Sequence, residues 1–122
     1  MASKSVVVIE DDLDMQHLIR LALEVEPEFE VVGEARTADG GVSIVELAQP
    51  DAVVLNHYLD AGGRGLDIVA RLKVAAPRAK VLLFSSHDLT VEASREPDLD
   101  AFLNKRRLTS LPSALSTMLG LG

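Results

Sequence analysis

The sequence predicts a single α/β domain in which a parallel β-sheet is covered by helices on both faces. Apolar runs recur at similar intervals, segments with helical spacing lie between them, and three of the four clearest runs show no polar alternation. Continuous apolar runs are typical of parallel strands that are buried on both faces. A chain of 122 residues fits one domain. We expect this domain to span residues 1–122, with a core from about 4 to 119 and no effector domain.

Four strands are predicted by the apolar runs at residues 6–9, 29–32, 52–55 and 81–84. The second run alternates between apolar and polar residues, so we expect it at or near a sheet edge. A fifth, shorter strand is predicted at residues 101–103. Strand and helix thus alternate five times, which implies right-handed crossovers in a doubly wound sheet.

The first helix is predicted by apolar residues three and four positions apart. Asp12 is expected to be its N-cap. The residues that carry the apolar spacing are Met15, Leu18, Ile19, Ala22 and Val25. We expect this face of the helix to pack against the sheet.

The later helices are bounded by residues that stop or start helices. The second helix is expected to end at Pro50 and the third before Pro77. Ser110 is expected to cap the last helix, which Gly120 and Gly122 close. Residues 88–97 include few apolar side chains, so any helix there is expected to have about two turns.

Composition and charge exclude several classes of function. The chain contains twelve Lys and Arg residues and nineteen Asp and Glu residues, so its formal net charge is −7. This negative charge disfavours direct nucleic-acid binding. The chain has no cysteine, which excludes disulfides and thiolate metal sites. No apolar run approaches the roughly 18 residues of a membrane span. We therefore expect a cytoplasmic domain without membrane contact, whose partners are proteins, small ligands or cations.

Polar residues follow four of the five predicted strands. They are Glu10, Asp11, Asp12, Asn56, Ser85 and Lys105. Each one alone has an ordinary explanation, such as an acid at a helix N-terminus. Because functional residues of doubly wound sheets gather at the carboxyl ends of the strands, the combination predicts one site at that edge.

These groups suit a divalent cation beside a phosphoryl group. Mg²⁺ takes oxygen ligands, typically one or two carboxylates together with phosphate oxygens. The Ser85 hydroxyl and the Lys105 ammonium would hold the remaining phosphoryl oxygens. The nucleophile is missing, because Asn56 is an amide where a carboxylate would complete an acyl-phosphate site.

From about residue 4 to residue 118 the chain resembles the receiver domain of two-component response regulators. Residues 7–12 resemble that family's first strand and acidic pair. Residues 50–56 are similar to the approach to the phospho-accepting aspartate, and residues 65–68 to the glycine-led start of the third helix. The resemblance implies a flavodoxin-like (βα)5 fold with strand order 2-1-3-4-5.

The resemblance also implies roles for individual residues. The Mg²⁺ ligands that it implies are Glu10, Asp11, Asn56 and the backbone carbonyl of Tyr58. Ser85 corresponds to the phosphate-site hydroxyl, Lys105 to the phosphate-site lysine and Phe102 to the switch aromatic. Asn56 occupies the phospho-acceptor position, and the loss of one negative ligand is expected to weaken Mg²⁺ binding. His57 is expected to be a solvent-facing loop residue.

Two explanations fit the amide at position 56. The chain is either a naturally degenerate receiver that signals without phosphorylation or an Asp→Asn variant that blocks phosphorylation. Glu10, Asp11, Ser85 and Lys105 are all retained, which favours the variant. The sequence is compatible with both.

The partners implied by the resemblance are a histidine kinase or a phosphotransfer protein and a downstream protein. The downstream partner is expected on a face that includes Val91, Phe102, Leu103, Arg107 and the last helix. A homodimer is also compatible with this pattern, and no enzymatic activity is expected.

Two other function classes are alternatives to a receiver. Residues 12–14 superficially resemble the two-aspartate motif of a small metal-dependent phosphatase of the haloacid-dehalogenase type. A nucleotide-binding module is the other alternative, but residues 62–65 lack the spacing of a glycine-rich phosphate loop.

Overall fold

The computed structural model describes residues 3–121 and contains one five-stranded parallel sheet. The strands are β1 (Lys4–Ile9), β2 (Phe29–Ala35), β3 (Ala52–Leu55), β4 (Lys80–Ser85) and β5 (Ala101–Asn104). Their spatial order is β2-β1-β3-β4-β5, so the alternating run at residues 29–32 does lie in an edge strand. The predicted fold class and strand order are confirmed.

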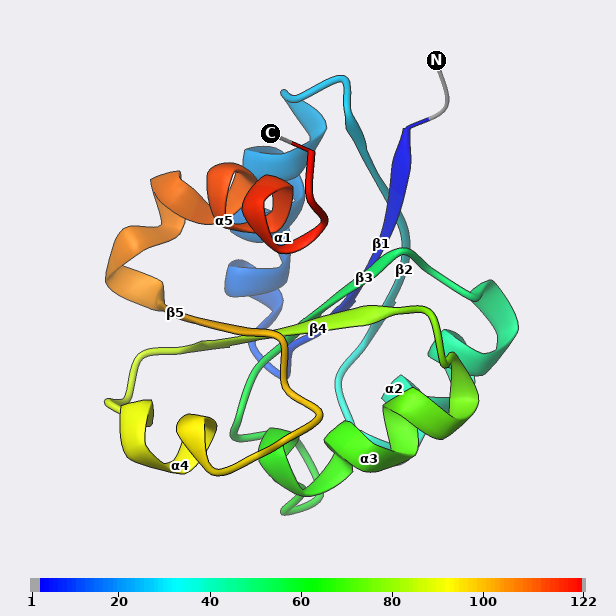
Figure 1. Ribbon diagram of the computed structural model, residues 1–122, viewed down its shortest axis with the longest axis vertical. Coiled ribbons are helices and arrows are strands. Elements are labelled where there is room, and N and C mark those ends of the chain that lie inside the picture. Colours follow the sequence, from blue (N-terminus) through cyan, green and yellow to red (C-terminus); the bar gives the residue numbers. More distant parts are fainter. Residues whose placement is uncertain (1–2, 122) are drawn as a thin grey trace.

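Helices cover both faces of this sheet. They are α1 (Leu13–Glu24), α2 (Ala38–Ala48), α3 (Gly65–Ala75), α4 (Thr90–Ser94), the 3₁₀ helix η1 (Lys105–Ser110) and α5 (Leu111–Met118). Figure 1 shows α1 and α5 together on one side of the sheet and α2 and α3 on the other. Within residues 3–121, no helix is long and apolar enough to cross a bilayer.

The apolar strand residues are divided between two cores. Val6 and Val8 of β1 belong to the core that includes residues of α1 and α5, whereas Val7 and Ile9 belong to the core that includes residues of α2 and α3. This division follows from the strand geometry, because successive side chains point to opposite faces of a sheet. A strand covered on both faces therefore needs an unbroken apolar run.

The face that α1 buries differs from the predicted one. The Asp12 side chain accepts hydrogen bonds from the N–H groups of Asp14 and Met15, which confirms the predicted N-cap. Ile19 and Leu23 are buried, but Leu18 and Val25 are exposed by 44% and 74%. Two overlapping apolar stripes satisfy the helical spacing, and packing against the sheet selects only one. Val25, in addition, lies beyond the last helical residue.

The start of α5 also differs from the prediction. Ser110 precedes the helix, as predicted, but its side chain makes no capping hydrogen bond. The helix η1 leads directly into α5, and the N–H of Leu111 donates to the carbonyl of Leu108. A backbone acceptor thus replaces the expected serine cap. Gly122 lies outside the described residues.

Candidate functional site

The carboxyl ends of β1 and β3 lie side by side. Ile9 of β1 pairs with Leu55 of β3, and the N–H of Asn56 donates to the Ile9 carbonyl at 2.8 Å. Because the register is parallel, Glu10 and Asn56 emerge next to each other at one edge of the sheet. Glycine is required at the start of α3, because a Cβ on Gly65 would collide with the Asn56 carbonyl oxygen.

The Asn56 amide is the centre of this edge. Its Nδ2 atom donates to Glu10 Oε2 at 3.0 Å, to Asp11 Oδ1 at 3.0 Å and to the Tyr58 carbonyl at 2.5 Å. An amide NH₂ group only donates hydrogen bonds, so this arrangement matches three oxygen acceptors to the nitrogen end of the side chain. Three oxygens from two loops therefore converge on one nitrogen.

Glu10 is the most deeply buried charged residue of the site. Its side chain is 1% exposed, and Lys105 Nζ lies 2.6 Å from Glu10 Oε1. Glu10 Oε2 also accepts a hydrogen bond from the N–H of Asp12 at 3.2 Å. Burial raises the pKa of Glu10, the neighbouring Asp11 side chain raises it further, and Lys105 lowers it.

The three consecutive acids have different surroundings. Asp11 is half-buried beside Asn56, whereas Asp12 is exposed and caps α1.

Gln16 was missed by the sequence analysis, although its side chain links two backbone segments at the site. Its Nε2 donates to the Glu10 carbonyl at 2.7 Å and to the Ala35 carbonyl at 3.3 Å. A polar residue four positions after the cap of an otherwise apolar helix face was the available signal.

Ser85 and Phe102 lie on the β4–β5 side of the site. Ser85 is fully buried at the end of β4, and its Oγ accepts a hydrogen bond from the N–H of His87 at 3.2 Å. Among the described residues it makes no hydrogen bond to the Glu10, Asp11 or Asn56 side chains. Phe102 is half-buried and packs against the core on the α2–α3 side.

The expectation of a solvent-facing His57 is wrong. His57 is buried, and its Nδ1 accepts a hydrogen bond from the N–H of Leu66 at 3.4 Å. Its ring meets the Tyr58 ring edge-on at 4.8 Å between centroids, and Tyr58 meets His87 in the same way at 4.8 Å. Burial lowers the pKa of His57, and the Arg64 charge lowers it further.

The oxygen atoms at this edge are of the type that Mg²⁺ prefers. They converge on one point, but that point is held by the Asn56 nitrogen, which carries hydrogens and cannot ligate a cation. Within residues 3–121, no group of three His, Cys, Asp or Glu side chains is arranged to hold a metal ion. The residues as arranged therefore do not fit a resident cation.

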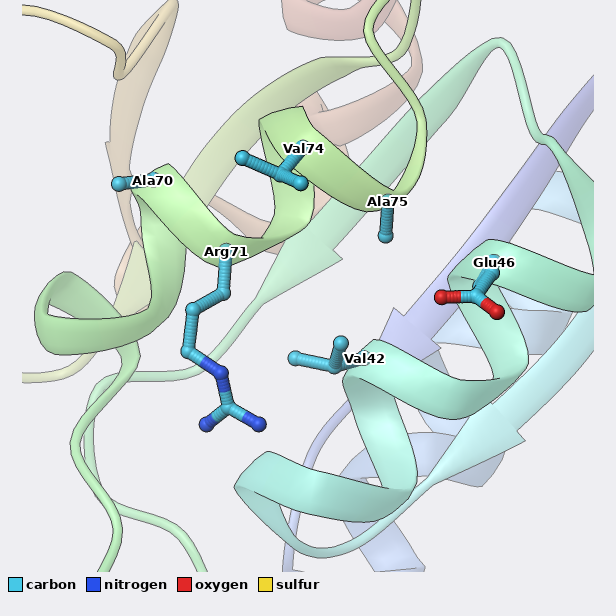
Figure 2. Close-up of a pocket in the computed structure, with 6 residues that line it drawn as sticks. All are labelled: Val42, Glu46, Ala70, Arg71, Val74 and Ala75. Carbon is cyan, nitrogen blue, oxygen red and sulfur yellow. The ribbon is translucent and has the colours of Figure 1, made fainter.

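A groove of about 520 Å³ lies elsewhere, between α2 and α3. Figure 2 shows Val42 and Glu46 of α2 facing Arg71, Val74 and Ala75 of α3 across it. None of its lining residues is a predicted site residue. The candidate site is therefore the polar edge at Asn56.

Comparison with known proteins is consistent with this geometry. The sequence model of the response regulator receiver domain family matches residues 6–115. The transcriptional regulatory protein DegU of Brevibacillus brevis is 30% identical over 83 residues, which are 68% of this chain and 35% of that protein. The nitrate/nitrite response regulator protein NarL of Escherichia coli is 23% identical over 103 residues, 83% of this chain and 47% of that protein. The chain thus spans less than half the length of these relatives.

Solved structures share the fold. A LuxR-family two-component response regulator from Aurantimonas sp. superposes with a TM-score of 0.88 at 20% identity, over 98% of this chain and 86% of that one. The receiver domain of the response regulator NarL from Mycobacterium tuberculosis gives 0.83 at 22% identity, over 98% and 99% of the two chains. At these identities the likeness concerns the fold alone.

Proposed function

The chain belongs to the response regulator receiver domain family of two-component systems, and we propose that it is a receiver that accepts no phosphoryl group at position 56. The observation that carries this proposal is the Asn56 amide, whose nitrogen donates to Glu10, Asp11 and the Tyr58 carbonyl. Phosphoryl transfer to a side chain requires a nucleophilic atom, such as a carboxylate oxygen of aspartate or a ring nitrogen of histidine. An amide supplies none.

The receiver then signals through protein contacts alone. Its proposed upstream partner is a histidine kinase or a phosphotransfer protein, which would bind without transferring its phosphoryl group to Asn56. Its proposed downstream partner contacts the face formed by α4, β5 and α5. Both assignments rest on membership of the family.

The α4–β5 part of this face has features that suit a protein partner. Val91 of α4 is 55% exposed. A hollow of about 280 Å³ lies between α4 and β5, lined by Thr90, Ala93, Leu99 and Phe102 among others. An exposed apolar side chain and a hollow on the same face provide places for a partner's side chains. Phe102 of β5 lines this hollow, and Lys105, which pairs with Glu10, directly follows β5.

We infer that the domain itself is not an enzyme. The phosphatase-like residues 12–14 do not form a site, because Asp12 caps α1 and Leu13 is 59% exposed. One curated relative is a protein-glutamate methylesterase/protein-glutamine glutaminase of Nitratidesulfovibrio vulgaris, but the match spans only 23% of that protein. The activity of a whole relative is therefore not carried over to this chain.

The test is phosphorylation by acetyl phosphate in the presence of Mg²⁺, followed by intact mass spectrometry. The chain is expected to keep its mass, whereas an Asn56→Asp variant is expected to gain one phosphoryl group. A phosphoryl group on the unmodified chain, mapped to Asp11, Asp12 or His57, would overturn the proposal. The variant serves as the matched control, because it shows that the remaining pocket is competent.

A further inference from the structure

Receiver domains generally bind Mg²⁺ at the phosphorylation site. We propose that in this chain the Asn56 side-chain amide takes the place of that cation, so that the pocket is complete without metal.

The first support is the position of the amide nitrogen. Glu10 Oε2, Asp11 Oδ1 and the Tyr58 carbonyl all lie within 3.0 Å of Asn56 Nδ2. These are the oxygens that a cation would draw together. The Asn56 NH₂ group brings the same oxygens together through hydrogen bonds, in which its two hydrogens are shared among three acceptors. It thereby links the ends of β1 and β3 through side-chain contacts.

The second support is the charge around this nitrogen. Glu10 and Asp11 supply two carboxylates, and Lys105 supplies one ammonium 2.6 Å from Glu10. A carboxylate at position 56 would add a third negative charge, which favours a bound cation. The amide adds no charge and directs the positive ends of its N–H dipoles toward the acids. The pocket with an amide at position 56 therefore attracts a metal ion less strongly than a pocket with a carboxylate there.

The third support is what a cation would have to displace. A metal ion among these oxygens requires Asn56 to rotate and present its Oδ1 atom, which breaks all three hydrogen bonds of Nδ2. Hydrogen bonds to charged acceptors are stronger than those between neutral groups. The free energy of their loss is subtracted from the free energy of metal binding, so we expect the unmodified chain to bind Mg²⁺ at least roughly tenfold more weakly than Asn56→Asp.

The experiment compares urea unfolding midpoints in EDTA and in saturating Mg²⁺ for the unmodified chain, Asn56→Asp and Asn56→Ala. The midpoint of the unmodified chain is expected to shift much less between the two conditions than that of Asn56→Asp. The midpoint of Asn56→Asp is expected to be lower in EDTA and to recover in Mg²⁺, because a ligand of the folded state stabilises it. In Asn56→Ala the side chain has neither a hydrogen-bond donor nor a charge, so this variant is expected to be less stable than the unmodified chain in EDTA.

Two outcomes would overturn the proposal. If Mg²⁺ raises the midpoint of the unmodified chain as much as that of Asn56→Asp, the amide does not replace the cation. If Mg²⁺ stabilises neither protein, these oxygens do not form a cation site in the first place. A second measurement needs no variant to fold: the side-chain NH₂ resonances of Asn56 are expected to stay unchanged and unbroadened when Mn²⁺ is added. Broadening of these resonances at low Mn²⁺ would contradict the proposal, whatever the phosphorylation test gives.

Discussion

Lys105 Nζ lies 2.6 Å from Glu10 Oε1 and joins the carboxyl end of β5 to that of β1 across the site. The Lys105 side chain is 14% exposed and that of Glu10 is 1% exposed, so this ion pair is shielded from water. A buried carboxylate that loses its partner is strongly destabilising, whereas exposed pairs contribute little. The site therefore depends on this pair for stability as well as for its charge.

We predict that Lys105→Met lowers the free energy of unfolding by about 3 kcal/mol at neutral pH, because Glu10 is left buried without its cation. Urea unfolding monitored by circular dichroism measures this change. The matched control is Lys73→Met, which removes a more exposed pair with Asp100 and is expected to cost about 1 kcal/mol. Equal costs for the two variants would show that burial of Glu10 does not matter.

The cost of Lys105→Met is also expected to depend on pH. The folded-state pKa of Glu10 lies above 4.5, chiefly because of burial. The folded protein therefore binds the Glu10 proton more tightly than the unfolded chain does. The resulting contribution to the free energy of unfolding is fully present below pH 4.5 and is lost as the pH rises through the folded-state pKa of Glu10. Without Lys105, that pKa rises further, so acidification toward pH 4.5 should shrink the cost of the substitution.

Unfolding midpoints at several pH values measure this dependence. Adding Glu10→Gln to Lys105→Met removes the titrating carboxyl and should flatten the dependence. A cost of Lys105→Met that grows as the pH falls would contradict the assignment.

Gly65→Ala is predicted to destabilise the fold by about 3 kcal/mol and to disturb the Asn56 loop. A Cβ at this position collides with the carbonyl oxygen of Asn56 and approaches the Leu55 side chain to 3.0 Å. The control is Gly62→Ala, where φ is +76° and no atom lies within 4 Å of the added Cβ. That change should cost only about 1 kcal/mol of backbone strain. Thermal unfolding of both variants checks the difference.

Asp12→Ala is predicted to lower the free energy of unfolding by about 1 kcal/mol, because it removes the N-cap of α1. The lost contacts are the hydrogen bonds from the N–H groups of Asp14 and Met15. The side-chain NH₂ resonances of Asn56 should stay in place, since the Asp12 side chain is not one of the acceptors of that amide. Asp11→Ala, in contrast, is expected to shift them because it removes an acceptor. Heteronuclear NMR spectra of the two variants separate the adjacent acids.

The sequence was sufficient to predict the sheet and the place of the site. Unbroken apolar runs at residues 6–9, 52–55 and 81–84 predict strands covered on both faces, because that requirement acts on each strand separately. Parallel strands bring their carboxyl ends to one edge, so the residues after the strands were candidates before any distance was known. Glu10, Asp11, Asn56 and Lys105 do lie together there.

Only the tertiary structure decided which atoms meet. Leu18 and Val25 share the helical spacing with Ile19, yet packing against the sheet buries only Ile19. His57 is buried because its loop folds back over the start of α3, where it accepts a hydrogen bond from Leu66. The nitrogen end of Asn56 faces the acids because three acceptors from two loops surround it. Periodicity and residue type are properties of short segments, whereas burial and hydrogen-bond partners depend on segments distant in the sequence.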